Sequence, residues 1–431
     1  MDADREVVEP RAGLPLDDVV AVDGSVLGLL DRIALGHAGC SAWRREVSAG
    51  GRPRDRDTSP RRLSSPQSVG RTVPRPSILN AGGRSRRMDR SVCVIGGGIA
   101  GAGAALALPD ALDVTVFESR AVGGRLASRR REGCIYDVGT DHVLLADGDL
   151  RELVADAAGD SLVEIDRPVK QFDADGTISE RPAEFPRFSG RDGIDTLVQS
   201  LFETSGARIE EGATVTALDR RGGQWVVTAA GHRRAFDAAV LAVPAAAAVV
   251  LFEGADWDAT LRRELARAAD DSAHRSIDVV ALHYPFAFGA DYYGLVSIER
   301  ASDVVWMGRE QCKRGHVPDG ESVLTLQLGS LWSAANANAS ARETAIESAH
   351  YVARLVGDDR LREPDWWDHH RWGQGVPTDG VDAALYERPL EFGLAIAGDW
   401  VAGVGQAHAA LASGLRAGRQ LAERFGSDPG A

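Results

Sequence analysis

Cysteine pairs are absent from this sequence. Its 431 residues include four cysteines, Cys40, Cys93, Cys134 and Cys312, which lie far apart and form no C-x-x-C pair. This spacing argues against a disulfide framework and against a zinc site, so no metal is expected. A reducing cytoplasm is the simplest location for such a chain.

Long apolar runs are missing as well. The longest, Ala238 to Phe252, is interrupted by Pro244 and is too short to cross a bilayer. No charged stretch followed by an apolar segment opens the chain, as it would in a secretory signal peptide. We therefore expect neither a membrane span nor secretion.

Lysine is scarce, because Lys170 and Lys313 are the only two, and the net charge is −14. The first 87 residues hold 15 arginines against 11 acidic residues, so the remaining body is strongly acidic. Such a body would repel phosphates, and nucleic acid is not an expected partner. Two explanations remain open: a salt-rich cytoplasm, where carboxylates keep a surface hydrated, and an ordinary acidic enzyme from a GC-rich genome.

Residues 1–87 do not read as part of a folded enzyme. Residues 41–87 are rich in Arg, Ser, Gly and Pro and have neither helical nor strand periodicity, so they are predicted to be disordered. Three interpretations compete: a basic tail that docks a partner, an organelle transit peptide, and a true start at Met88. Eight acidic residues among the first 40 count against the transit peptide. The opposite charges of the two parts favour the start at Met88.

A nucleotide-binding pattern follows Met88. The β-forming stretch SVCVI leads into a G-x-G-x-x-G pattern at Gly96, Gly98 and Gly101, and a helix of small residues comes next. The first glycine permits a tight turn, the second lets a pyrophosphate approach the backbone, and the third lets the helix pack on the strand. A second strand ends at Glu118, 17 residues after Gly101, where its carboxylate is placed to bind the ribose hydroxyls. All these parts in register predict a dinucleotide site.

The residues after Glu118 favour FAD over NAD. The stretch SRAVGGRLASRR places Gly124 and Arg125 shortly after the acid. A guanidinium at that position can reach back to the pyrophosphate, whose charges would then face an arginine as well as a helix N-terminus.

These motifs resemble the FAD-dependent amine oxidase superfamily, and within it the bacterial renalase-like oxidoreductases. The resemblance rests on the glycine triplet, Glu118, GGRLASRRREGCIYDVGTDH, FPRFSGRDGIDTLVQSL, HHRWGQGVP and the terminal GLAIAGDW…GQAHAALASGLRAG, and it runs from about Met88 to Phe425. It implies an α/β fold with a Rossmann-type FAD-binding domain and an inserted α+β substrate domain built on an antiparallel sheet. The sequence also departs from the renalase-like pattern, because YDVGTDH differs from the usual D-H-G-A-Q at Val138, Thr140 and Asp141.

The resemblance also implies roles for single residues. The backbone of Val215 would pair with adenine, Asp399 would bind the ribityl chain or a phosphate, and the N-terminus of the last helix, near Gln406, would face the flavin pyrimidine. The complete set of expected FAD-binding residues is Gly96, Gly98, Ile99, Ala100, Gly101, Glu118, Ser119, Gly124, Arg125, Leu126, Val215, Pro244, Gly398, Asp399, Gln406 and Ala407.

The remaining segments predict a second domain. We expect an FAD-binding domain at 88–139, 190–250 and 388–426, and a substrate domain at 140–189 and 251–387, whose strand-rich pattern predicts an antiparallel sheet over the flavin. Residues 340–357 read as a helix. The candidate pocket residues are His142, His283, Trp306, Trp372 and Trp400. Each also has an ordinary packing explanation, and no catalytic residue can be named, since the flavin carries the difficult step.

The expected function is that of an FAD-dependent oxidase in the cytoplasm. It would take a hydride from a small-molecule substrate, which could be an aberrant dihydronicotinamide isomer, and pass the electrons to molecular oxygen. A second hypothesis is an amine oxidase or desaturase acting on a bulkier, apolar substrate. A third, of another class, is a flavin-bound redox sensor or scaffold without turnover.

Overall fold

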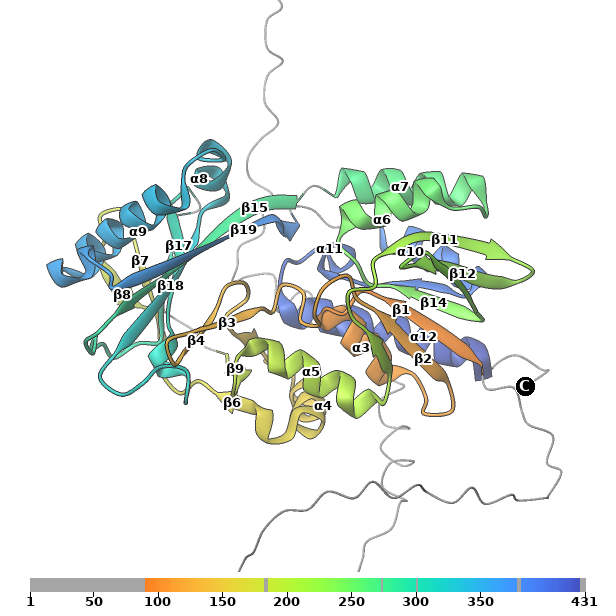
Figure 1. Ribbon diagram of the computed structural model, residues 1–431, viewed down its shortest axis with the longest axis horizontal. Helices are drawn as coiled ribbons and strands as arrows, with labels where there is room; N and C mark the ends of the chain where they lie inside the picture. Colours follow the sequence, from red (N-terminus) through yellow and green to blue (C-terminus); the bar gives the residue numbers. More distant parts are fainter. Residues whose placement is uncertain (1–89, 182–184, 273, 300, 378–380, 427–431) are drawn as a thin grey trace, which may run out of the picture. The chain divides into compact units, whose positions relative to one another are not determined.

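The computed structural model describes residues 90–181, 185–272, 274–299, 301–377 and 381–426 (Figure 1). The predicted leader, residues 1–87, lies outside the described residues. Among the described helices, none is long and apolar enough to cross a membrane.

A five-stranded parallel sheet forms the first part of the fold. In sheet order its strands are β10 (Arg208–Glu210), β2 (Asp113–Phe117), β1 (Ser91–Ile95), β14 (Ala238–Leu241) and β20 (Leu394–Ile396). Alternate residues of β1 serve two different cores: Val92 and Val94 face one, and Cys93 and Ile95 face the other. Both faces of the sheet are therefore covered, as is typical of parallel sheets.

Helices cover one face of this sheet, and helices and a small sheet cover the other (Figure 1). The first layer consists of α3 (Ile99–Ala107), α5 (Ile194–Ser205) and α12 (Ala407–Gly426). The second layer contains α6 (Ala245–Gly254), α7 (Ala259–Asp271), and the antiparallel strands β11 (Val215–Arg221), β12 (Gln224–Ala229) and β13 (His232–Phe236). This arrangement confirms the Rossmann-type prediction.

Glycines let α3 and α12 approach closely. A Cβ on Gly414 would lie 2.0 Å from the carbonyl oxygen of Ala100, and one on Gly418 would lie 2.4 Å from that of Ala104. The small residues of the last helix therefore serve helix packing along most of its length.

A seven-stranded sheet forms the second part of the fold. In sheet order its strands are β19 (Trp366–Pro377), β15 (His274–Tyr284), β18 (Ser322–Leu328), β17 (Val304–Arg309), β16 (Gly294–Ser297), β7 (Val169–Phe172) and β8 (Ile178–Glu180). The pairing is antiparallel as predicted, except between β16 and β7, which run parallel. Helix α9 (Ala341–Val356) packs on one face and begins with a capping box between Ser340 and Glu343.

Shorter elements lie around these two sheets. They are β3 (Ser128–Arg131), β4 (Cys134–Asp137), β5 (Val143–Leu144), α4 (Gly148–Ala158), η3 (Gly159–Ser161), β6 (Leu162–Glu164), β9 (Arg187–Gly190), η4 (Glu310–Cys312), α8 (Ser330–Ala335), η5 (Asp359–Arg362), α10 (Ala383–Glu387), η6 (Arg388–Phe392) and α11 (Asp399–Ala402).

The packing refines the proposed domain limits. Val154 of α4, and Leu261 and Leu265 of α7, belong to the cores of the parallel sheet, although both helices fall within the ranges expected for the substrate domain. We therefore propose that both helices belong with the nucleotide-binding part, while β7, β8 and β15 to β19 make up the substrate sheet.

Candidate active site

The glycine turn after β1 leaves room where a ligand would need it. Gly96 has a φ of +112°, and a Cβ there would lie 2.4 Å from the carbonyl oxygen of Ala242. A Cβ on Gly101 would lie 2.0 Å from the carbonyl oxygen of Gly96. By contrast, a Cβ on Gly98 would have only the Cα of Gly124 as a neighbour, at 4.0 Å. Two glycines thus close the turn, and the third leaves open space at the N-terminus of α3.

That N-terminus is suited to an anion. Gly98 occupies the N-cap of α3 and contributes no side-chain cap, and Ile99 and Ala100 form the first turn without an acidic residue. The amides of a helix N-terminus carry partial positive charge and bind phosphate groups readily. The open space at Gly98 and these amides together fit a pyrophosphate.

Glu118 is held at the end of β2 by the same turn. One carboxylate oxygen, Oε2, accepts a hydrogen bond from the amide of Gly97 at 2.7 Å. The other, Oε1, accepts from the amide of Arg120 at 2.8 Å and from the hydroxyl of Ser119 at 3.1 Å. The acid therefore lies beside the glycine turn, where the sequence pattern predicted a ribose-binding carboxylate.

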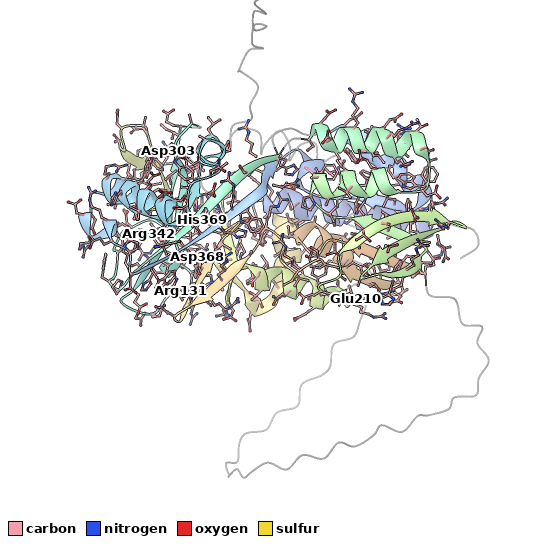
Figure 2. The ribbon with its side chains drawn as sticks, turned by 45° about the horizontal axis from the view of Figure 1, so that its top comes forward. Arg131, Glu210, Asp303, Arg342, Asp368 and His369 are labelled. Carbon is pink, nitrogen blue, oxygen red and sulfur yellow. The ribbon has the colours of Figure 1, made fainter. Side chains whose placement is uncertain are left out.

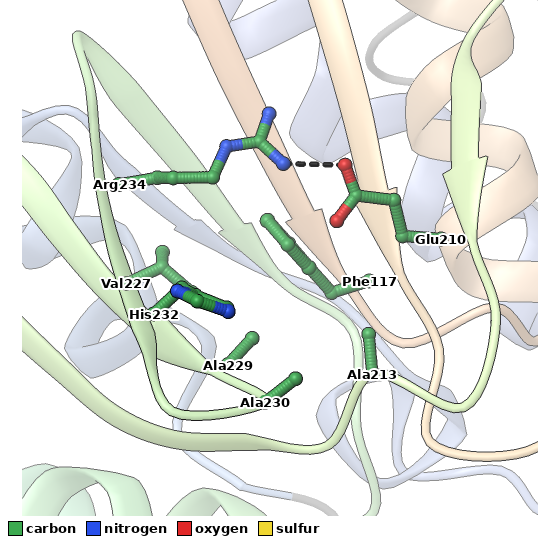
Figure 3. Close-up of a pocket in the computed structure, with 8 residues that line it drawn as sticks. All are labelled: Phe117, Glu210, Ala213, Val227, Ala229, Ala230, His232 and Arg234. Carbon is green, nitrogen blue, oxygen red and sulfur yellow. Dashed lines mark hydrogen bonds and ion pairs between the residues drawn. The ribbon is translucent and has the colours of Figure 1, made fainter.

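A small cavity lies next to this end of the site. It measures about 270 Å³ and is lined mainly by apolar side chains and one ion pair, between Arg234 and Glu210 (Figure 3). Phe117 of its wall directly precedes Glu118, and the amide of Ala213 donates to the carbonyl oxygen of Glu118. Val215 begins β11 nearby, in register with Ala229 of the cavity wall. The cavity is therefore a neighbour of the expected adenosine end, away from the substrate sheet.

Arg125 joins three distant segments. Its guanidinium forms a bidentate ion pair with Asp399, at 2.6 and 2.7 Å, and donates to the carbonyl oxygen of Gly375 on β19 at 2.9 Å. Asp399 is buried, whereas 26% of the Arg125 side chain is exposed. The arginine expected at the pyrophosphate and the acid expected at the ribityl chain thus lie together. Gly124 and Leu126 flank the arginine, and Gly398 precedes the acid.

Two buried glutamine oxygens lack donors near the start of α12. The Oε1 atoms of Gln406 and Gln374 accept no hydrogen bond from the residues that the structure describes. Gln406 directly precedes Ala407 at the start of α12, and Val376 and Pro377 at the end of β19 pack against Gly405. A buried acceptor without a donor is costly. These oxygens, the space at Gly98 and the guanidinium of Arg125 together fit a bound FAD.

Three side chains in a row across the substrate sheet hold the segment 138–142. On β19, Trp372 pairs with Ile277 of β15, next to a β-bulge. Two residues further along β15, Val279 pairs with Gln327 of β18. Gln327 in turn pairs with Trp306 of β17. Trp372 donates to the carbonyl oxygen of Val138 at 2.7 Å, and Gln327 donates to that of Gly139 at 3.2 Å. The indole of Trp306 donates to the carboxylate of Asp141 at 2.6 Å. Side chains from β19, β18 and β17 therefore bind successive points of one segment.

The same segment also contacts Arg125. The amide of Thr140 donates to the carbonyl oxygen of Arg125 at 2.9 Å, and a Cβ on Gly139 would lie only 2.1 Å from that oxygen. The row on the substrate sheet is thus connected to the nucleotide-binding part through residues 138–142.

Asp141 gathers three side chains around one buried carboxylate. It accepts hydrogen bonds from Trp306, from the hydroxyl of Tyr293 at 2.9 Å, and from Nδ1 of His142 at 2.8 Å. Burial alone would raise the pKa of Asp141, but His142, Lys313 and these hydrogen bonds lower it below its ordinary value, so the carboxylate is ionised. The imidazole of His142 lies against Trp306, with ring centroids 5.2 Å apart, and stays partly exposed.

A buried ion cluster adjoins this group. The Nζ of Lys313 lies 2.6 Å from Asp137 and 3.0 Å from Glu310, and His316 lies 2.9 Å from the other oxygen of Glu310. Burial alone would lower the pKa of Lys313, but Asp137 and Glu310 outweigh it and raise that pKa. Lys313 is therefore a charged structural residue with both its carboxylate partners present.

Two of the candidate pocket residues lie elsewhere. Trp400 is fully buried in a core of the parallel sheet, where its indole donates to the carbonyl oxygen of Val243 next to Pro244. His283 stacks on Trp366 and pairs with Glu321. The structure therefore brings together His142 and Trp306, with Trp372 three strands away in the sheet order, and separates Trp400 and His283 from them.

The segment β3–β4 is fixed to β19 by charged and polar pairs. Asp368 of β19 forms an ion pair with Arg129 at 2.6 Å and accepts a hydrogen bond from Tyr136 at 2.8 Å. Asp368 and His369 are labelled in Figure 2, close to Arg131 of β3, which donates to the carbonyl oxygen of Trp367. Arginines 129 and 131 thus have partners on the substrate sheet.

Comparison with known families decides the identity. The family described as flavin containing amine oxidoreductase matches residues 177–422, more than half of the chain, and an NAD(P)-binding Rossmann-like domain matches residues 94–157. The chain belongs to the flavin-containing amine oxidoreductase family. It is an FAD-dependent oxidoreductase, as the resemblance predicted at superfamily level.

Solved structures show the same fold. A protein assigned as a protoporphyrinogen oxidase from Exiguobacterium sp. 255-15 has a TM-score of 0.61 at 17% identity, covering 80% of this chain and 99% of its own. Cyclohexylamine oxidase from Brevibacterium oxydans IH-35A has a TM-score of 0.62 at 15% identity, covering 78% and 100%. Putrescine oxidase bound to putrescine has a TM-score of 0.60 at 15% identity, covering 78% and 98%. No curated protein matches the chain significantly.

Sequence reasoning missed three members of the site in this oxidoreductase. Asp141 was noted only as a departure from a family pattern, and Tyr293 and Gln327 were not singled out. The adjacent pair Asp141-His142 was the one available signal, because a carboxylate beside a histidine is typical of an oriented imidazole. Gln327 and Tyr293 are recognised only through strand register.

Proposed function

We propose that this FAD-dependent oxidoreductase takes a hydride from a small substrate bound beside residues 138–142, and that molecular oxygen then takes the electrons. The observation that supports this location is the group around Asp141, where the buried carboxylate and the partly exposed imidazole of this segment meet two aromatic side chains, Tyr293 and Trp306. Bound FAD supplies the hydride acceptor. Aromatic side chains together with a few fixed polar groups are typical of the residues that line small-molecule sites.

Our leading substrate class is a dihydronicotinamide isomer, as in the renalase-like proteins that the sequence resembles. Flat rings of this kind stack well on Trp and His side chains. Departures from the renalase pattern at Val138, Thr140 and Asp141 lie within the segment that the substrate sheet holds, so they bear directly on specificity.

A small amine is the second candidate. Asp141 is an ionised carboxylate surrounded by aromatic rings, a combination that attracts organic cations. The family and two of the similar structures, putrescine oxidase and cyclohexylamine oxidase, are named for amines. An amine oxidase or desaturase reaction on a bulkier, apolar substrate falls within this candidate.

The residues of the chain have defined tasks in either reaction. Trp372, Gln327 and Trp306 fix the segment 138–142. Because ionised Asp141 accepts a hydrogen bond from Nδ1 of His142, that nitrogen carries a proton, and in a neutral imidazole Nε2 is then the acceptor. From an amine, Nε2 of the neutral imidazole can accept the N–H proton while the hydride leaves the adjacent carbon. A dihydronicotinamide has no N–H on its ring nitrogen and becomes a pyridinium cation when the hydride leaves, so towards that substrate Nε2 only accepts a hydrogen bond. No acid or base beyond this imidazole is assigned.

The test is anaerobic reduction of the protein-bound flavin. The full-length protein is mixed with isomeric dihydronicotinamides, and separately with putrescine and cyclohexylamine, and flavin absorbance is followed. Bleaching by the isomers alone supports the first candidate, and bleaching by amines alone supports the second. A flavin that no donor bleaches would contradict both.

A variant links the reaction to the site. His142→Gln should slow bleaching by the active donor at least tenfold without altering the absorbance of the bound flavin. His350→Gln, on the remote helix α9, is the matched control and should leave the rate unchanged. Equal rates in all three proteins would remove His142 from the site.

A further inference from the structure

Three potential metal ligands converge at a second place on the substrate sheet. Cys134 begins β4, His283 lies near the end of β15, and Glu321 directly precedes β18. Their ligand atoms, one sulfur, one imidazole nitrogen and one carboxylate oxygen, all lie within 4.8 Å of one another. Residues from three distant segments therefore form one cluster, which the flavin site does not use.

The distances within the cluster suit a tetrahedral metal ion. Oε2 of Glu321 lies 3.0 Å from Nε2 of His283 and 3.9 Å from Sγ of Cys134. Zinc binds nitrogen and oxygen at about 2.0–2.2 Å and thiolate sulfur at about 2.3 Å, so tetrahedral ligands lie roughly 3.3–3.7 Å apart. The two distances from Glu321 lie within a few tenths of an ångström of that range, and the sulfur and the imidazole nitrogen lie within 4.8 Å of each other.

The surroundings resemble those of a built site. Cys134 and His283 are buried, whereas 36% of the Glu321 side chain is exposed, which leaves a path from solvent. Behind the imidazole, a carboxylate oxygen of Asp365 lies 3.5 Å from Nδ1 of His283. That nitrogen is buried and has no hydrogen-bond partner among the described residues. A carboxylate on the far nitrogen of a ligand histidine is the usual second contact of a metal site.

The ring of His283 is also fixed in orientation. It stacks on the indole of Trp366, with centroids 4.8 Å apart and planes 2° from parallel. The amide of Asp365 donates to the carbonyl oxygen of His283 at 2.9 Å, so the second carboxylate is positioned by the sheet itself.

A second cluster of potential metal ligands in the same molecule already contains a cation of its own. Asp137, Glu310 and His316 also bring ligand atoms together, but the Nζ of Lys313 lies between the two carboxylates and supplies the positive charge. No described lysine or arginine forms an ion pair with Glu321 or Asp365. Within the described part of the chain, the Cys134 cluster thus has its ligands without a lysine or arginine ion-paired to its carboxylates.

We propose that Cys134, His283 and Glu321 bind a divalent transition metal, with zinc as the best chemical match and water in the fourth position. Thiolate and imidazole ligands select zinc over magnesium or calcium. Asp365 acts as a positioning residue for the imidazole. The metal would link β4 to the end of β15 and the start of β18 in the substrate sheet, independently of FAD.

The experiment measures metal in the full-length flavoprotein. The protein is stripped with a chelator, reloaded with Zn²⁺, desalted and analysed for zinc per chain. We expect one zinc per chain in the wild type and in the control Cys312→Ser, and less than a tenth of that in Cys134→Ser and His283→Gln. Asp365→Asn should weaken affinity about 10–100-fold.

Cobalt provides a readout of ligation. Co²⁺ added to the stripped protein should give d–d absorption in the red, where oxidised flavin does not absorb, and Cys134→Ser should abolish it. Glu321→Gln changes a partly exposed position, so this variant should fold and yet bind the metal more weakly than the wild type. It therefore tests the proposal even if Cys134→Ser does not fold. No zinc retained by the wild type, or undiminished zinc in a folded Cys134→Ser or Glu321→Gln, would overturn the proposal.

Discussion

At the scale of single residues, the two glycines that flank the start of α3 should respond differently to the same change. Gly98 has φ −83° and ψ −178°, a conformation open to any residue, and a Cβ there meets almost nothing. Gly98→Ala should therefore fold normally but bind FAD at least tenfold more weakly, because the methyl group occupies the space left for the pyrophosphate. Flavin content after dialysis against graded FAD, with the unfolding temperature of the apoprotein, measures both effects.

Gly101→Ala is the matched variant. Its Cβ would lie 2.0 Å from the carbonyl oxygen of Gly96, so helix and strand must separate. Overpacking of this kind costs about 1–3 kcal/mol or more of the free energy of unfolding. A Gly98→Ala protein with unchanged FAD affinity would show that the open space at α3 serves another purpose.

The residues found from sequence alone are those whose role depends on local spacing. Gly96, Gly98, Gly101 and Glu118 belong to one βαβ unit, and their relative positions follow from the lengths of its strand and helix. The members of the substrate site depend instead on pairing between distant strands. Gln327 meets Gly139 across 188 residues, and a bulge in β15 shifts the register beside Trp372. The hydrophobic pattern within one strand does not predict contacts of this kind between distant strands.

At the scale of elements, the buried ion cluster holds β4, η4 and α5 together. Asp137 of β4 binds Lys313, which follows η4, and also accepts a hydrogen bond from the amide of Ile194 at the start of α5. Lys313→Met should lower the free energy of unfolding by about 3–5 kcal/mol, because it leaves Asp137 and Glu310 buried without their cation. Chemical denaturation measures this loss.

An exposed ion pair serves as the control for the buried ion cluster. Arg362 and Asp359 form an ion pair in η5 on the surface, and Arg362→Met should change the free energy of unfolding by less than about 1 kcal/mol. Similar small losses in both variants would mean that the three elements are held by apolar packing and that the charges are incidental.

Elements were predicted more reliably than their arrangement. The buried strands β1, β14 and β20 were identified from short apolar runs that end at glycine or proline, and α9 from its periodicity and cap. The parallel pairing of β16 with β7 was not expected, since these strands lie more than a hundred residues apart. The assignment of α4 and α7 to the nucleotide-binding part likewise depends on tertiary packing.

At the scale of the whole described molecule, Arg125 connects the nucleotide-binding part to the substrate sheet. It lies beside the glycine turn and contacts both Gly375 of β19 and Asp399 of α11. A cofactor bound at the glycine turn should therefore order β19 as well. We expect FAD loading of the apoprotein to slow amide hydrogen exchange at residues 96–101 and also at 371–377, because ligands stabilise the segments whose ordered state they bind.

Arg125→Met tests whether Arg125 transmits the effect of FAD binding from the glycine turn to β19. The variant keeps the glycine turn, so FAD at saturating concentration should still protect residues 96–101, whereas protection at 371–377 should fall toward the level of the apoprotein. Arg131→Met, which removes a partly exposed arginine from β3, should retain protection in both segments. Protection confined to residues 96–101 in the wild type would mean that the ion pair between Arg125 and Asp399 joins the two parts without transmitting cofactor binding.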